Sequence, residues 1–218
     1  KKSRVEEIFK EDEVINKEFN QDLKIQIDEQ FVINKKNIDY TNNDGLVNFD
    51  GNLKNISKYK YSKIKNFYQY EPEIVFYKNN IIFFDNKGTV IMFDKNSKLI
   101  WKKNYYSKTD QKQNPVLQFA KYNKNLIVAD NLANYFMLDI ETGELIWSKK
   151  NLAPFNSQIK IINDKFFIID FSNALRCFSL KNGKELWSVG TQSSLIRSQK
   201  KLSIVVSNNT IYFNNSIG

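Results

Sequence analysis

The chain has 218 residues, of which 26% are charged and 41% hydrophobic, and its formal net charge is +9. This balance is ordinary for a soluble globular protein, and no stretch approaches the ~18 consecutive apolar residues of a membrane-spanning helix. Histidine is absent and Cys177 is the single cysteine, which excludes histidine-based triads, histidine metal sites, an intrachain disulfide and multi-cysteine metal sites.

The positive charge is spread along the chain instead of forming one basic block. Lysines are interspersed with asparagine, isoleucine and tyrosine throughout the sequence. We therefore predict that the chain has no nucleic-acid partner. The alternative is a basic stripe that assembles only in three dimensions.

The N-terminal part of the sequence does not follow the pattern of the remainder. Residues 1–24 are dense in both charge signs, and we interpret them as a solvated tether or a short amphipathic helix. Residues 25–70 contain irregular strand-like runs. Within them, residues 45–64 resemble half of the repeat unit that follows, with Tyr59 near the position of its tryptophan.

From residue 71 onward, short apolar runs alternate with turns rich in Asn, Asp, Lys and Gly, which is typical of an all-β protein. Three hairpins end in Trp101, Trp147 and Trp187, at spacings of roughly 40–46 residues, which is the period of propeller blades. The sequence therefore predicts an all-β propeller of four-stranded blades over residues 71–218. The expected blades are residues 71–107, 115–150 and 156–190, with a partial blade at 200–218.

The tryptophan hairpins share a turn that requires an unusual backbone conformation. Gly143 and Gly183 each lie four residues before their tryptophan, where a short loop needs a positive φ. The first hairpin has Ser97 there and is one residue shorter, so we expect a different turn. The tryptophans are predicted to pack between neighbouring blades, and cofactor stacking is the alternative. Cys177 is expected to be a buried small hydrophobe, with a reactive thiol as the alternative.

These hairpins resemble the repeats of the pyrroloquinoline-quinone-like (PQQ-like) propeller superfamily, whose blades end in the pattern LD-x-x-TG-x-x-x-W. Leu138, Asp139, Thr142, Gly143 and Trp147 match the pattern without a gap. The third hairpin departs from it, with Ser179 and Asn182 in place of Asp and Thr. The resemblance implies the fold more strongly than a function, because scaffolds and enzymes share these repeats.

Two branches of the superfamily imply different functions. Quinoprotein dehydrogenases hold PQQ with a metal ion and, in many members, adjacent cysteines, which the lone Cys177 does not provide. BamB-like lipoprotein propellers of the outer-membrane β-barrel assembly machinery are non-catalytic. The chain resembles the latter, which implies a periplasmic, non-enzymatic protein-binding scaffold without catalytic, cofactor-binding or metal-binding residues. A PQQ-dependent dehydrogenase, or a fragment of one, is the alternative.

The ends of the sequence predict an incomplete ring of about three full blades, with partial blades at both ends. The chain starts at Lys1 without methionine, which allows a lipid anchor upstream, and it stops within a blade. We therefore expect the intact polypeptide to continue with further tryptophan hairpins, and residues 45–64 to form half of a closing blade.

Strand parity predicts which end of the blades binds a partner. In a four-stranded meander, the turn between strands two and three emerges beside the connection to the next blade. That end carries Asp85, Asp130, Asp170 and Asn214, which we expect to cap turns, with a ligand-binding ring as the alternative. Its longer connections contain four predicted partner-binding residues, for which local packing is the alternative: Tyr105, Tyr106, Phe155 and Arg197.

Overall fold

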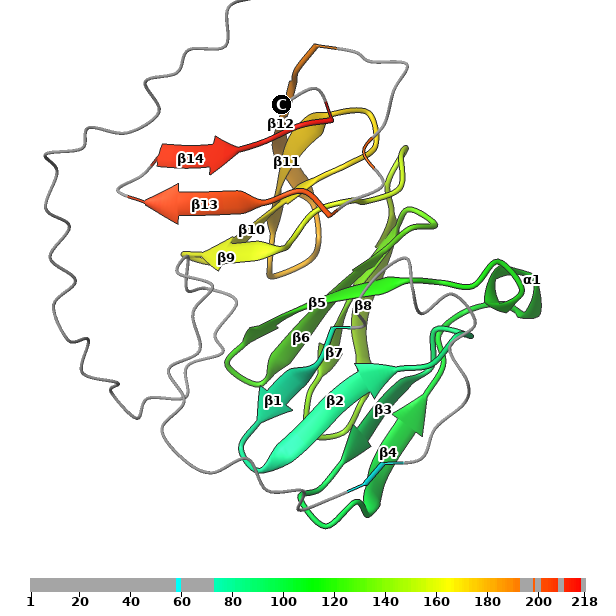
Figure 1. Cartoon of the computed structure of the whole chain (residues 1–218). Helices are drawn as coiled ribbons and strands as arrows, with labels where there is room; N and C mark the ends of the chain where they lie inside the picture. Colours follow the sequence, from blue (N-terminus) through cyan, green and yellow to red (C-terminus); the bar gives the residue numbers. More distant parts are fainter. Residues whose placement is uncertain (1–57, 60–72, 193–197, 199–200, 208–209, 217–218) are drawn as a thin grey trace, which may run out of the picture.

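The computed structural model describes residues 58–59, 73–192, 198, 201–207 and 210–216. These residues form three four-stranded antiparallel sheets and one two-stranded sheet. The sheets succeed one another in chain order along an arc (Figure 1). This arrangement confirms the predicted all-β, incomplete propeller. The predictions for residues 1–24 and for most of residues 25–70 lie outside the described part of the chain.

We call the four sheets blades A to D. Blade A contains β1 (Val75–Tyr77), β2 (Asn80–Phe84), β3 (Val90–Phe93) and β4 (Leu99–Lys103), and blade B contains β5 (Leu117–Tyr122), β6 (Asn125–Asp130), β7 (Asn134–Asp139) and β8 (Leu145–Lys150). Blade C contains β9 (Lys160–Ile162), β10 (Lys165–Ile169), β11 (Ala174–Ser179) and β12 (Glu185–Gly190), and blade D contains β13 (Ile204–Ser207) and β14 (Thr210–Phe213). One short helix, α1 (Lys108–Gln111), lies in the connection between blades A and B.

The turns explain how a chain with few glycines forms so many hairpins. Asn123, Asn163 and Asn173 adopt positive φ in turns of blades B and C, a conformation that asparagine tolerates better than most residues. Gly143 and Gly183 have φ values of 69° and 67°, as predicted.

The β3–β4 turn of blade A differs in span from those of blades B and C. Ser97 also takes a positive φ, of 63°, but its N–H donates to the carbonyl three residues back instead of four. The shorter loop therefore turns differently, as expected. The pairs β3–β4, β7–β8 and β11–β12 each contain a register shift at the same place, next to the residue paired with the tryptophan.

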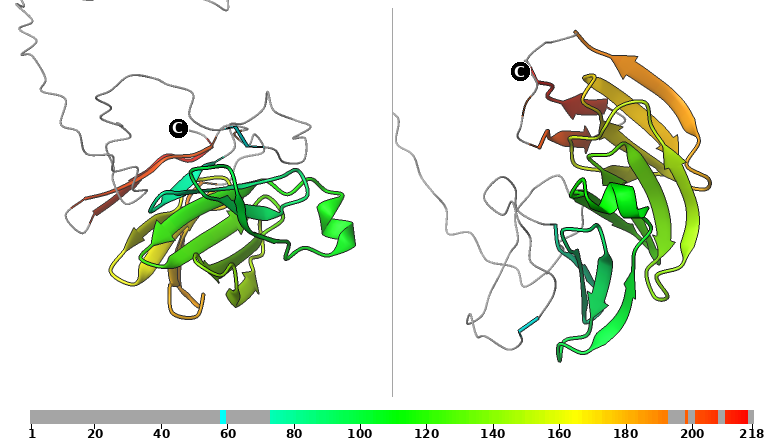
Figure 2. Two further views of the ribbon diagram at one scale, coloured as in Figure 1. Left: turned by 90° about the horizontal axis from the view of Figure 1, so that it is seen from below. Right: turned by 90° about the vertical axis from the view of Figure 1, so that its right-hand side faces the viewer.

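The hydrophobic core lies between blades, and each junction has its own cluster of buried side chains. Phe84, Phe119 and Phe136 belong to the cluster between blades A and B. Phe166 and Phe178 belong to the cluster between blades B and C. Strands β2, β3, β6 and β7 are largely buried, whereas β4, β8 and β12 are largely exposed. The last three strands lie along the outer side of the arc (Figure 2). The blades are thus held together face to face.

The tryptophans lie at the end of the blades that carries the turns between the first and second strands and between the third and fourth strands of each blade, which we call the tight-turn end. The Nε1–H of Trp101 donates to the carbonyl of Ile140 in the next blade at 3.0 Å. The Nε1–H of Trp147 makes the equivalent bond to Leu180 at 2.9 Å. The predicted packing between blades is therefore confirmed for these two tryptophans.

Trp187 differs from the other two and corrects the expectation that all three are largely buried. Trp101 is 8% exposed, whereas Trp187 is 39% exposed. The physical reason is that the described part of blade D has two strands and therefore no turn between a third and a fourth strand to cover the indole. The Trp187 ring contacts Phe167 of its own blade, with ring centroids 5.8 Å apart.

The outer face of blade A packs against a residue from the N-terminal part of the chain. The ring of Tyr59 makes edge contacts with Phe83 and Phe93 at centroid distances of 6.3 and 5.5 Å. Tyr59 thus lies beside the first blade, next to the face that does not contact blade B. The remainder of the predicted closing half-blade lies outside the described residues.

Candidate functional site

The end of the blades that carries the β2–β3, β6–β7 and β10–β11 turns and the blade-to-blade connections is called the long-connection end. Its aspartates cap those three turns. Oδ1 of Asp130 accepts the N–H groups of Leu132 and Asn134 at 2.8 and 2.7 Å. Oδ1 of Asp85 and of Asp170 accepts the two equivalent N–H groups of its own turn. All three aspartates are at most 1% exposed. Their carboxylates therefore stabilise the turns and do not form a ligand-binding ring.

Tyr106 and Phe155, two of the predicted partner-binding residues, are buried. Tyr106 is 9% exposed, and its hydroxyl donates to Oδ2 of Asp130 at 2.6 Å. Phe155 is 1% exposed and lies in the core between blades B and C. Burial raises the pKa of the Tyr106 hydroxyl well above its ordinary value. Partner contact through these two rings is therefore unsupported, and the alternative of local packing explains them.

Tyr105 is half-buried against the core between blades A and B, and its hydroxyl donates to the carbonyl of Gly143. Burial raises its pKa to about 12. Arg197 lies outside the described residues.

Leu152, which the sequence reasoning did not single out, is 96% exposed in the connection between β8 and β9. It is the most exposed large hydrophobic side chain of the described residues and lies at the long-connection end.

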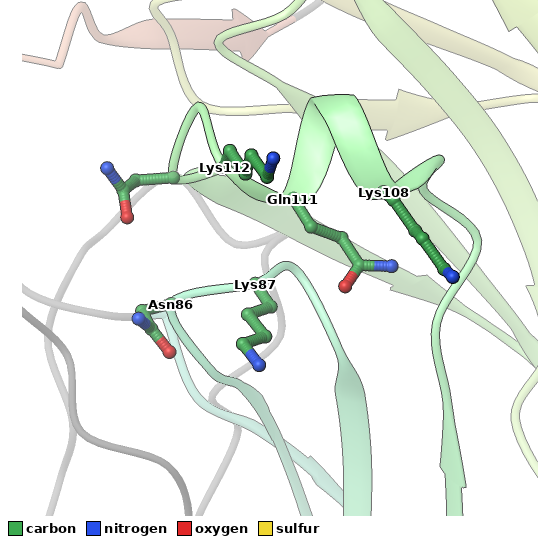
Figure 3. A pocket seen from close by; sticks show the side chains of 6 residues that line it. Asn86, Lys87, Lys108, Gln111 and Lys112 are labelled. Carbon is green, nitrogen blue, oxygen red and sulfur yellow. The ribbon is translucent and has the colours of Figure 1, made fainter.

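A polar pocket lies at the same end, between the β2–β3 turn of blade A and the segment that contains α1 (Figure 3). Its volume is about 410 Å³. Six residues line it, three with ammonium groups and three with side-chain amides: Lys87, Lys108, Lys112, Asn86, Gln111 and Asn114. We call these six residues the basic pocket. Both walls come from segments that strand parity assigns to one end of the blade.

Asn104 holds the two walls of the basic pocket together. Its Nδ2–H donates to the Lys87 carbonyl and to Oγ1 of Thr89, both at 3.0 Å. Its Oδ1 accepts the Tyr106 N–H at 2.9 Å and the Gln111 Nε2–H at 3.2 Å. One asparagine side chain therefore bonds to the turn, the connection and α1, and so fixes their relative positions.

A glycine next to Lys87 and the N-cap of helix α1 stabilise the two segments that form the pocket. Gly88 has a φ of 73°, and a Cβ at this position would lie 2.5 Å from the ring of Tyr106, so only glycine allows this approach. Helix α1 begins after Ser107, whose Oγ accepts the Asp110 N–H at 3.1 Å. The sequence reasoning missed this helix, although the Ser-x-x-Asp pattern of an N-cap was present.

The lysines of the basic pocket have no acidic partner among the ion pairs of the described residues. Those pairs use the carboxylates of Glu73, Glu141, Asp170 and Glu185. The pocket therefore concentrates positive charge and amide donors without an internal counter-ion, which suits a negatively charged group. Sequence reasoning missed it because the lysines come from two separate segments of a chain in which lysine is common.

A metal site, a reactive thiol and a membrane-spanning helix are three other features that would bear on function. Within the described ranges, no group of three or more acidic, cysteine or histidine side chains could hold a metal ion. Cys177 is fully buried, which confirms its predicted packing role, and burial raises the pKa of its thiol. No helix in the described part of the chain is long and apolar enough to cross a membrane.

Comparison with solved structures finds the propeller arrangement in other proteins. BamB from Moraxella catarrhalis superposes with a TM-score of 0.56 at 15% identity, over 66% of this chain and 42% of that chain. The computationally designed protein Ika8 superposes with a TM-score of 0.53 at 12% identity, over 66% of this chain and 42% of its own. The designed protein Ika4 gives 0.52 at 11% identity, over 73% and 93%. At such low identity, these similarities establish the fold alone.

Comparison of the sequence identifies the family. A search of curated proteins finds no match. The family model described as "Outer membrane protein assembly factor BamB" matches residues 86–218, which is more than half of the chain. The matched region begins between β2 and β3 of blade A and includes blades B to D. It therefore contains all three tryptophan hairpins. The chain therefore belongs to the BamB family of PQQ-like β-propellers.

Proposed function

We propose that this chain is a non-enzymatic, extracytoplasmic scaffold that binds protein partners during outer-membrane protein assembly. The observation that carries the proposal is the family match over residues 86–218. The similarity to BamB from Moraxella catarrhalis is consistent with it at the level of the fold. Periplasmic location, membership of an outer-membrane assembly complex and a lipid anchor upstream of Lys1 belong to the same proposal.

The long-connection end is the surface that we assign to partner binding. Leu152 replaces the buried Tyr106 and Phe155 as its apolar contact, because 96% of its surface is accessible. Arg197 remains a predicted contact at this end. Substituting Leu152 with glutamate removes an apolar contact and adds a charge at an exposed position. We therefore expect weaker partner capture without a change in the free energy of unfolding above about 0.5 kcal/mol.

The proposal is tested by purifying the affinity-tagged, full-length protein from detergent-solubilised membranes of its native host. Mass spectrometry should show enrichment of identified outer-membrane assembly proteins relative to a tagged, unrelated periplasmic protein. The Leu152→Glu variant should reduce this enrichment, whereas Leu145→Glu on an outer strand should not. A deletion strain should contain lower levels of outer-membrane β-barrel proteins.

Two results would contradict the proposal. One is a full-length protein that co-purifies with no assembly protein, in a host whose outer-membrane composition is unaffected by the deletion. The other is stoichiometric binding of PQQ in the presence of calcium, observed as a bound-cofactor spectrum with dye reduction. The second result would support the alternative of a PQQ-dependent quinoprotein dehydrogenase.

A further inference from the structure

We propose that the basic pocket receives an acidic peptide segment, a short run of aspartate and glutamate side chains, from a protein partner. This inference rests on the proposed scaffold function and names the chemistry of the partner segment. The basic pocket lies at the end of the blades that carries the long connections and the exposed Leu152. It thus adds a charged contact to an end of the molecule that also presents an apolar one.

The charge of the pocket supports an anionic occupant. Lys87, Lys108 and Lys112 contribute three ammonium groups, and none of the six lining residues is acidic. The two carboxylates nearest to these lysines in the sequence, Asp85 and Asp110, do not line the pocket. Asp85 is 1% exposed and caps its turn, and Asp110 accepts the Ser107 hydroxyl at 2.8 Å. An incoming carboxylate would therefore meet positive charge that is not already neutralised by a lining side chain.

The distribution of the donors favours successive carboxylates over a single compact anion. Figure 3 shows Lys87 on the turn of blade A and Lys108 and Gln111 on the facing helix, so the donors come from two walls. The volume of about 410 Å³ is within the range of about 300–1,000 Å³ that is usual for ligand-binding pockets. No arginine lines the pocket, so the fork that binds phosphate with two parallel hydrogen bonds is not provided by its walls.

The lining also argues against a membrane surface as the occupant. The six lining residues are lysines and amides, and none of them has an apolar side chain that could enter the acyl region of a bilayer. A peptide segment needs no such contact, because its carboxylates and backbone carbonyls can be bound by ammonium and amide groups alone.

The pocket walls are preorganised for binding. Asn104 fixes the carbonyl of Lys87 and the side chain of Gln111 relative to one another, and Gly88 packs directly on the ring of Tyr106. Tyr106 is in turn anchored by Asp130 of blade B. These contacts hold the backbone of the two walls in place before a ligand binds, which limits the entropy lost in forming the complex.

The test is a fluorescence anisotropy titration of the purified full-length protein against fluorescein-labelled hexaglutamate at low ionic strength. The pocket variant combines Lys87→Gln, Lys108→Gln and Lys112→Gln. The matched control combines Lys95→Gln, Lys98→Gln and Lys184→Gln, which removes the same charge from exposed tight turns. We expect the pocket variant to bind about 10-fold more weakly than the wild type, because three exposed ion pairs are lost. The control variant should bind within about twofold of the wild type.

Further arms identify the ligand class and test the integrity of the pocket variant. Hexalysine should not bind the wild type, but should bind a variant with Lys87→Glu, Lys108→Glu and Lys112→Glu. This gain of binding cannot arise from misfolding. Phosphatidylglycerol vesicles and millimolar inorganic phosphate should displace hexaglutamate only at concentrations at which added chloride of equal ionic strength also displaces it.

Several outcomes would overturn the proposal. They are equal loss of binding in the pocket and control variants, no binding of hexaglutamate by the wild type, and preferential displacement by phosphate or by vesicles. Co-purification with assembly proteins is measured separately. If co-purification persists while hexaglutamate fails to bind, only the acidic-segment inference fails. If hexaglutamate binds through the pocket and no assembly protein co-purifies, only the proposed function fails.

Discussion

At the tight-turn end, an indole ring joins blade A to blade B and another joins blade B to blade C, whereas a pocket lined with exposed lysines lies at the long-connection end. A Cβ at Gly143 would lie 2.8 Å from the Trp101 ring, and one at Gly183 would lie 2.7 Å from the Trp147 ring. Lys87, Lys108 and Lys112 at the opposite end are exposed and line the basic pocket. The same strands thus support a packed end and an open end.

The difference indicates how the two ends respond to substitution. At the tight-turn end, a side chain fills space between blades, so a change alters the free energy of unfolding. At the long-connection end, the structural groups are the buried ones, such as Asp130 and Tyr106, and the exposed groups are free to contact a partner. Residue type alone does not distinguish the two roles, since Tyr106 resembles a binding residue in composition and is a core residue by position.

The largest effect is expected from removing the indole at a complete junction. Trp101→Ala should lower the free energy of unfolding by about 3–5 kcal/mol, because a large buried aromatic ring and its hydrogen bond to Ile140 are lost. Trp187→Ala should cost about 1.5 kcal/mol or less, because that ring is 39% exposed. Urea unfolding of both variants measures the difference. Equal losses of unfolding free energy in the two variants would show that the two tryptophans stabilise the protein equally, despite their different exposure.

A smaller loss is expected from a single methyl group at the tight-turn end. Gly143→Ala should cost about 2–4 kcal/mol, because the new Cβ both strains a φ of 69° and contacts the Trp101 ring. Ser97→Ala is the matched control, since this position already holds a non-glycine residue at a φ of 63°. Its effect should stay below about 1 kcal/mol. A harmless Gly143→Ala substitution would argue against the close packing of blade A on blade B.

Tyr106→Phe tests the buried polar contact at the long-connection end. It removes the hydroxyl that donates to Asp130 at 2.6 Å, while Nδ2 of Asn134 still donates to the same carboxylate oxygen at 2.9 Å. The expected loss is therefore about 1–2 kcal/mol, measured by urea unfolding. Hexaglutamate binding should remain within about twofold of the wild type, because the phenyl ring keeps its packing on Gly88. Weaker peptide binding with unchanged stability would reverse the assignment of Tyr106 to the core.

The smallest effect is confined to alkaline solution. Burial raises the pKa of Tyr105 to about 12 in the folded chain, against an ordinary value near 10. The folded state holds this proton more tightly, so the associated stability is fully present below pH 10 and is lost as the pH rises through 12. Unfolding experiments at pH 9 and pH 11 should show the decline, and Tyr105→Phe should reduce it. The same decline in the Phe variant would assign it to other groups.

Much of the fold could be predicted from the sequence because its determinants are local and repeated. The alternation of apolar residues defined the strands, and the requirement for positive φ placed Gly143 and Gly183 in turns. The junctions required more than this local information. Trp187 has the same register in its blade as Trp101, but its burial depends on whether a neighbouring hairpin covers it.

The candidate site was less predictable for the same physical reason. Tyr106 and Phe155 lie in connections, yet the chain folds back so that both rings enter the core. The pocket lies at the end that strand parity predicts to bind a partner, but parity does not indicate which residues line it. Lys87 and Lys108 line the same pocket because Asn104 forms hydrogen bonds to both walls, to the Lys87 carbonyl and to the Gln111 side chain. These partners are far apart in the sequence.

Trp101 of blade A packs directly on the turn glycine Gly143 of blade B, and a double-mutant cycle measures this contact. The free energy of unfolding is measured by urea for the wild type, Trp101→Ala, Gly143→Ala and the double variant. Without the indole, the closest contact of the alanine methyl group at residue 143 is removed, whereas the strain of the positive φ and the 3.2 Å approach to Cγ of Lys103 remain. We predict that Gly143→Ala costs about 1–2 kcal/mol less in the Trp101→Ala background than in the wild type. Losses that add to within about 0.5 kcal/mol would contradict direct packing of the two residues.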